Sequence, residues 1–305
     1  MYRNSGNCAF PITITITITI TITITVPSQH LPPSVLNFNV TSSPEIQIIV
    51  MEDVIMSEVV LAISGSLRKP SFTEKMLDLC IEGMGTDLKV YKFYPHKMKI
   101  GPCNSCWSCW GKKNPGECVQ KDDFTQILDV YMKADYLLIA VPLYYFDLPA
   151  TVKNVIDRFF VALEPAQEED PQGNTQHPKR FGRHPKTVLI SSCGFPEMEN
   201  FDILSRHFHI ICEHMDWKWS GEILISAAGA ANVPKLFDRK YELIREAGSQ
   251  LRTGEILPET TQAIAAPVMA PEAYRQMTTL SFESGMIAKA KMAAIAIKAM
   301  RNREI

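Results

Sequence analysis

The chain has 305 residues, of which 46% are hydrophobic and 21% are charged, and its formal net charge is −2. This composition is typical of a globular protein, and such a balanced charge argues against a dedicated nucleic-acid binder. The sequence has no run of about 18 apolar residues, so we expect no transmembrane helix and no membrane partner. We also recognise no export signal, and therefore expect a reducing, cytoplasmic environment.

The first 55 residues differ from the rest of the chain. Residues 12–25 repeat the dipeptide Ile-Thr seven times, without a charge or a turn residue. The period of two fits a β-strand, and an adhesive segment is one interpretation. We favour the other, in which residues 1–55 are a low-complexity, disordered leader, and the functional chain starts near Met51 or Met56.

From residue 56 onward, short apolar runs alternate with segments of helical spacing. The expected strands are 57–66, 88–94, 135–142, 186–192 and 217–229, and the expected helices are 71–84, 122–134, 149–163 and 198–215. Strands that alternate with helices predict an α/β fold whose parallel sheet is covered on both faces. We expect a flavodoxin-like, doubly wound sheet of five strands in the order 2-1-3-4-5, formed by residues 56–232.

Residues 233–305 are expected to form a helical C-terminal extension. The apolar positions of its Ala-rich last stretch suit a packing or dimer face, and a membrane-surface helix is the less favoured alternative. Residues 167–184, rich in charge and turn formers, are expected to be a lid or partner loop, or simply solvated surface.

Ligands of doubly wound sheets bind at the carboxyl ends of the strands, and here three loops follow strands at that edge. In the first, residues 64–73, Ser71 begins a helix and Glu74 completes a capping box. Capping accounts for Ser71 but not for the hydroxyl of Ser66 or the charge of Arg68. Together with Thr73 and the helix N-terminus, these groups predict a phosphate site.

The second and third loops offer a flat, apolar slot. Three aromatic residues, Tyr144, Tyr145 and Phe146, follow Pro142 and Leu143 directly after the third strand. In the third loop, Gly194 allows a close backbone approach. A phosphate site beside an aromatic slot predicts a mononucleotide, and FMN fits better than a nucleoside triphosphate because no Walker motif is present.

Four of the eight cysteines lie within residues 101–120, at Cys103, Cys106, Cys109 and Cys118. The spacing C-x2-C-x2-C-x8-C differs from the two separated knuckles of a zinc site. Three cysteines at successive short intervals favour a [4Fe–4S] cluster, with uncoordinated thiols as the alternative. Trp107 and Trp110 either shield the cluster or cap the flavin pocket. Cys80 and Cys212 are expected in the core, and the histidines at 207, 209 and 214 are taken as ordinary helix residues.

These three stretches, "GSLRKPSFT", "CNSCWSCW…GECVQKDDF" and "VPLYYFDLPATVKNVIDRF", resemble in order and spacing the flavodoxin-like NAD(P)H-dependent FMN reductase family. Specifically they resemble its iron–sulfur flavoprotein branch, in which the last cysteine gap is typically shorter. The resemblance runs from about residue 59 to 229, and is weaker in the helical tail.

The resemblance implies roles for individual residues. The FMN phosphate loop corresponds to Ser66, Arg68, Ser71, Phe72 and Thr73, although the usual Gly-Asn pair is replaced here by Ser71-Phe72. The loop that borders the flavin ring corresponds to Pro142, Leu143, Tyr144, Tyr145 and Phe146, and the third flavin loop to Ser192, Cys193 and Gly194. Asp157 and Arg158 match a family pair whose role is helix anchoring, subunit contact or catalysis.

We therefore expect a flavoprotein oxidoreductase that takes electrons from NAD(P)H or another donor and passes them through FMN, with or without a cluster, to a small molecule or a redox protein. No catalytic side chain is predicted. The alternatives are a cluster-free reductase of quinones, nitroaromatics or free flavin, and a non-enzymatic carrier of the flavodoxin type. By resemblance, we expect a homodimer or homotetramer.

Overall fold

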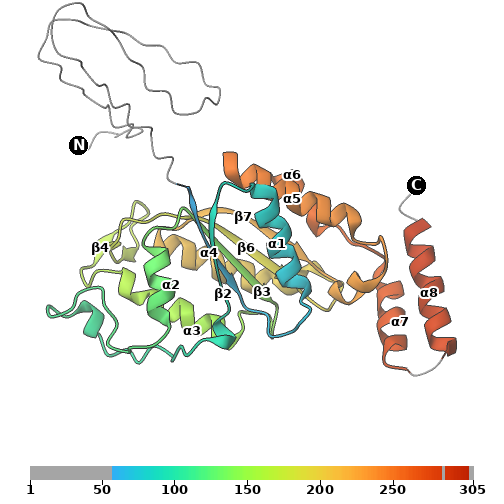
Figure 1. Cartoon of the computed structure of the whole chain (residues 1–305), viewed down its shortest axis with the longest axis horizontal. Helices are drawn as coiled ribbons and strands as arrows, with labels where there is room; N and C mark the ends of the chain where they lie inside the picture. Colours follow the sequence, from blue (N-terminus) through green and yellow to red (C-terminus); the bar gives the residue numbers. More distant parts are fainter. Residues whose placement is uncertain (1–56, 284–285, 302–305) are drawn as a thin grey trace, which may run out of the picture. The chain divides into compact units, whose positions relative to one another are not determined.

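The structure, a computed structural model, describes residues 57–283 and 286–301 (Figure 1). The leader expected at 1–55 lies outside the described residues. One parallel sheet is built from five strands, β1 (Val59–Ser64), β2 (Lys89–Phe93), β3 (Tyr136–Pro142), β6 (Lys186–Ser192) and β7 (Lys218–Ile225). Their order is β2-β1-β3-β6-β7, which confirms the predicted flavodoxin-like sheet.

The central strands are buried on both faces, which explains why they read as continuous apolar runs. Residues 136–141 of β3 are all buried, as are residues 60–64 of β1. Strands covered on both sides have no solvent face and therefore need no polar alternation. Because β1, β3 and β6 pair in parallel, their carboxyl ends lie at one edge of the sheet, where the three predicted loops begin.

Helices cover both faces of the sheet (Figure 1). One core lies between the sheet and α1 (Phe72–Met84) and α5 (Asp238–Thr253). The other lies under α2 (Phe124–Tyr131), α3 (Ala150–Arg158) and α4 (Asp202–Met215). Cys80 and Cys212 are buried in these two cores, and burial raises the pKa of each thiol to about 12.

The C-terminal region begins with α5, which packs closely against α1. A Cβ atom added to Gly248 would lie 2.0 Å from the carbonyl oxygen of Cys80, and one on Gly83 would lie 2.0 Å from that of Arg245. The two glycines thus allow the helix backbones to touch. Three further helices follow, α6 (Pro258–Ala265), α7 (Pro271–Ser281) and α8 (Met286–Arg301), as the expected helical extension requires.

Two segments differ in detail from the expected elements. The helix expected at 149–163 is α-helical to Arg158 and continues as a 3-10 helix, Phe159–Ala162. The segment 167–184 contains a small hairpin, β4 (Glu168–Glu169) and β5 (Thr175–Gln176). Among the described residues, no helix has the length and apolar character needed to cross a membrane.

Candidate functional site

The three loops at the carboxyl edge are joined to one another by hydrogen bonds. The Thr73 hydroxyl of the first loop lies 2.7 Å from the Ser192 hydroxyl of the third, and this contact is buried. The backbone N–H of Leu143 in the second loop donates to the carbonyl of Ser192 over 3.0 Å. Ser192 therefore connects both other loops, and the structure brings the predicted flavin-binding segments together.

The first loop leads into the N-terminus of α1. Ser71 caps this helix, because its hydroxyl accepts a 3.1 Å hydrogen bond from the backbone N–H of Glu74. Ser66 is buried, and its hydroxyl accepts from the backbone N–H of Arg68 over 3.3 Å, while the Arg68 side chain is exposed. The ring of Phe72 packs edge-on against Phe237 at 5.2 Å, so it anchors the loop to the helical side of the sheet.

The second loop contains a tight turn in an unusual backbone conformation. Tyr144 and Asp147 exchange two backbone hydrogen bonds, and the two residues between them, Tyr145 and Phe146, both have positive φ values of 47° and 67°. Turns of this kind favour Asn and Gly, and each left-handed aromatic residue costs about 1–2 kcal/mol. The Tyr145 side chain is nevertheless 99% exposed. Strain and exposure of aromatic rings together indicate a functional turn.

A histidine from α4 holds this turn. His207 Nδ1 lies 2.8 Å from Asp147 Oδ1, and the same oxygen accepts from the backbone N–H of Leu148 at 2.7 Å. The prediction that His207 is an ordinary helix residue therefore missed its contact with this turn. A comparison of the helical positions of His207, His209 and His214 could not reveal this contact, because Asp147 lies 60 positions away in the sequence.

The third loop contains a buried thiol, Cys193, next to an exposed glycine, Gly194. Cys193 is buried, and burial raises its pKa to about 11, so the group stays a neutral thiol near pH 7. Gly194 is exposed, and a Cβ atom there would meet no heavy atom within 4 Å. The hydroxyl of Tyr274 in α7 donates to the carbonyl of Gly194, so the C-terminal helices contact this loop.

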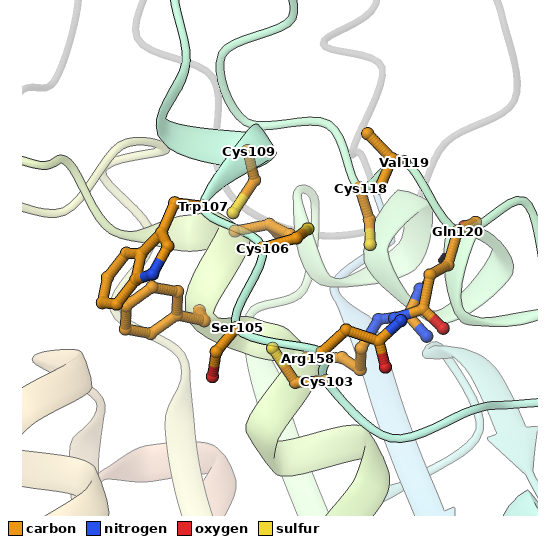
Figure 2. A pocket seen from close by; sticks show the side chains of 12 residues that line it. Cys103, Ser105, Cys106, Trp107, Cys109, Cys118, Val119, Gln120 and Arg158 are labelled. Atoms are coloured by element: carbon orange, nitrogen blue, oxygen red, sulfur yellow. Dashed lines mark hydrogen bonds between the residues drawn. The ribbon is translucent and has the colours of Figure 1, made fainter.

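The cysteine loop forms a separate pocket (Figure 2). All four predicted ligands line it, together with Arg158, Phe160 and Trp107. The enclosed space is about 20 Å³, which holds roughly one water molecule. Within the described residues, no three His, Cys, Asp or Glu side chains are already arranged around a common ion position. The donor set of four thiols suits a thiolate-bound group.

The ionisable groups that line this pocket differ in the direction of their pKa shifts. Hydrogen bonds from the backbone and then the hydroxyl of Ser108 lower the pKa of the exposed Cys106 thiol, whereas burial raises that of Cys109. Burial opposes the charge of Arg158, but hydrogen bonds with Asp122 and the neighbouring Cys118 thiol outweigh it and raise the guanidinium pKa. The pocket thus contains a guanidinium together with one thiol whose pKa is lowered and one whose pKa is raised.

Aromatic rings cover one side of the pocket. Trp110 stacks on Phe160 with a centroid distance of 4.4 Å and also contacts His177 at 4.7 Å. Trp107 packs against both Trp110 and Phe160 yet remains 56% exposed. Trp107 therefore lines the thiol pocket, and Trp110 packs against it. Whether the two tryptophans shield a cluster or cap the flavin pocket stays a prediction.

The sheet order and the joined loops define an α/β protein of the flavodoxin-like class. Residues 59–180 match the family described as NADPH-dependent FMN reductase. Two archaeal proteins named iron–sulfur flavoprotein are also similar. The one from Archaeoglobus fulgidus is 34% identical over 99 residues, covering 32% of this chain and 44% of that protein. The one from Methanosarcina thermophila is 30% identical over 104 residues, covering 32% and 51%.

Residues 59–180 are therefore similar to the NADPH-dependent FMN reductase family, and the two named relatives support the resemblance to its iron–sulfur flavoprotein branch. The matched segment spans about half the length of these curated relatives.

Solved structures share the fold. An FMN-dependent NADH-azoreductase from Bacillus anthracis, in complex with FMN, aligns with a TM-score of 0.50 at 13% identity, over 64% of this chain and 100% of that one. A structure described as a quinone reductase from Klebsiella pneumoniae aligns with a TM-score of 0.53 at 17% identity, over 76% and 99%.

Proposed function

We propose that this protein is an FMN-dependent NAD(P)H oxidoreductase that passes electrons onward through a [4Fe–4S] cluster. The observation that carries the proposal is the joining of three loops at one sheet edge, through Thr73, Ser192 and Leu143, with a pocket of four thiols on the neighbouring cysteine loop. The family of residues 59–180 supports the flavin part, and the named relatives support the cluster part.

The residues of the sheet edge fit FMN. Two buried hydroxyl oxygens there, Ser64 Oγ and Thr151 Oγ1, have no hydrogen-bond partner among the described residues, as expected where a polar ligand is to be bound. Ser66, Arg68 and the first backbone N–H groups of α1 would hold the phosphate. Tyr144, Tyr145 and Phe146 would cover the flavin ring, and Gly194 would admit its edge. Bound FMN supplies the exchange between two-electron and one-electron chemistry.

The cysteine loop would hold the cluster through Cys103, Cys106, Cys109 and Cys118, whose softness as thiolates suits iron and sulfide. The proposed acceptor is a one-electron redox protein or small molecule, and the proposed assembly is a homodimer or homotetramer in the cytoplasm. The narrow pocket is the observation that favours the second candidate, a cluster-free FMN reductase.

The test is anaerobic purification of the full chain, followed by measurement of flavin, iron, sulfide and steady NAD(P)H oxidation. Bound flavin with about four irons per chain and steady oxidation is expected. Flavin without iron would leave the cluster-free reductase, and cofactors without NAD(P)H oxidation would leave an electron carrier. If no flavin binds, the assignment of the three loops is wrong.

Arg68→Gln is expected to weaken FMN binding about 10- to 100-fold, because a charge-assisted hydrogen bond to phosphate contributes about 1.5–3 kcal/mol. FMN affinity is measured by fluorescence titration of the flavin-free protein. Lys69→Gln is the matched control, since it removes the same charge from the next exposed position. An equal loss in both variants would mean that only the overall charge of the loop matters, not a contact from Arg68.

His207→Ala is expected to lower FMN affinity by up to about ten-fold, because the hydrogen bond that holds Asp147 in the strained turn contributes about 1 kcal/mol. The same fluorescence titration measures the change. His214→Ala alters an exposed histidine on the same helix and should leave the affinity unchanged. Parental affinity in the His207 variant would show that the turn keeps its conformation unaided.

A further inference from the structure

The two ends of the cysteine loop meet at Arg158. Its Nη1 donates to the carbonyl oxygen of Gly101 over 3.1 Å, and its Nη2 to that of Gln120 over 3.4 Å. The guanidinium also forms a forked pair with Asp122, at 2.8 and 3.0 Å. Asp122 in turn accepts from the backbone N–H of Gly101 at 3.0 Å. One ion pair therefore closes the base of the segment that carries all four thiols.

Arg158 is also part of the thiol pocket itself. Its side chain is 1% exposed and lines the pocket with Cys103 and Cys118 (Figure 2). Its Cζ lies 4.8 Å from the centre of the Phe124 ring. The buried Nε–H has no hydrogen-bond partner within the part of the chain that the structure describes. A buried donor without an acceptor costs about 1–3 kcal/mol, so such a group is retained where a ligand satisfies it.

The chemistry of the pocket indicates what would accept this hydrogen bond. Thiolates and bridging sulfides are negatively charged acceptors, and hydrogen bonds to these sulfurs help to set the reduction potential of iron–sulfur clusters. Partners behind the ligands also orient them, and their loss typically weakens metal binding. A guanidinium is suited to both roles, because its fork can hold the loop while Nε–H faces the ligand.

We propose that Arg158 is the positioning residue of the cysteine loop, closing the loop at its base and donating its Nε–H to a sulfur of the group that the four thiols bind. This inference rests on the proposed function, since it assumes a thiolate-bound group. It assigns to Arg158 a role in the cysteine pocket, in place of the helix-anchoring, subunit-contact or catalytic roles that the resemblance implies.

Arg158→Lys is the variant of choice, because lysine keeps the buried charge beside Asp122 but lacks both the fork and Nε. Arg183→Lys is the matched control, since Arg183 is half-buried and its Nε donates to the carbonyl of Met132 at 2.7 Å, outside the pocket. Bound FMN per chain and the melting temperature establish that both variants are folded. The readouts are iron and sulfide content, the midpoint potential of the cluster, and the affinity of the iron-free, reduced protein for Cd²⁺.

Arg158→Lys is expected to lose iron or to shift the cluster potential to more negative values, and to bind Cd²⁺ about 10- to 100-fold more weakly. Parental iron content, potential and Cd²⁺ affinity in this variant would overturn the proposal. If the parent protein contains no iron but binds Cd²⁺ in an Arg158-dependent way, the cluster part of the proposed function is wrong and the positioning role stands. If the parent binds neither metal, both are wrong.

Discussion

Replacement of Cys106 by alanine is expected to abolish bound iron while leaving FMN in place. Cys106 is exposed and lines the thiol pocket, and hydrogen bonds from Ser108 lower its pKa. The thiolate is the form that binds metal, and a lowered pKa favours this form. A cluster deprived of one of its four ligands in such an exposed position is not expected to survive purification.

The measurement is the ratio of iron and sulfide to flavin in the anaerobically purified protein. Asn104→Ala is the matched control, because Asn104 is exposed and lines the same pocket without a sulfur atom. The control should keep its iron, and both variants should keep FMN, since the flavin loops belong to another part of the sheet edge. Undiminished iron in the Cys106 variant would exclude this residue as a ligand.

Gly248→Ala is expected to lower the free energy of unfolding by about 3 kcal/mol, because the added methyl group overpacks the crossing of α1 and α5. Its Cβ would lie 2.0 Å from the carbonyl oxygen of Cys80 and 3.1 Å from the backbone nitrogen of Met84. Backbone atoms cannot rotate away as side chains do, so the two helices have to separate.

The sign of the change in the free energy of unfolding shows whether α1 and α5 pack closely at Gly248. In a helix without such a contact, replacing glycine by alanine stabilises by about 1 kcal/mol. Urea unfolding followed by circular dichroism gives the free energy for Gly248→Ala and for Ser249→Ala, which alters the exposed neighbour on the same helix. The control should be neutral or slightly stabilising. A stabilised Gly248 variant would contradict the close packing of the two helices.

The sheet could be predicted from the sequence because its signals are local. Buried parallel strands appear as apolar runs, and the segments between them show the apolar spacing of helices. The position of α5 was harder to predict, since it depends on two isolated glycines, Gly83 and Gly248, each of which lies against the backbone of the other helix. Nothing in a single sequence pairs two glycines 165 positions apart.

The candidate site likewise has parts that the local sequence predicts and parts that depend on contacts between distant segments. The loops were predictable because the ends of parallel strands meet at one edge, and residues in them could be named from local composition. The contacts of His207 with Asp147, and of Arg158 with both ends of the cysteine loop, join distant segments. Both residue types are common in helices, so neither contact could be predicted from the local sequence. Whether Cys103, Cys106, Cys109 and Cys118 bind a cluster stays a prediction.

The closed base of the cysteine loop bears on how this region tolerates insertions. Because Arg158 and Asp122 hold Gly101 and Gln120 together, residues between them can be added without moving the sheet or the flavin loops. For a flexible loop, even a doubling in length costs only about 0.6 kcal/mol of closure entropy. The eight residues between Cys109 and Cys118 therefore add little to the entropic cost of closing this loop.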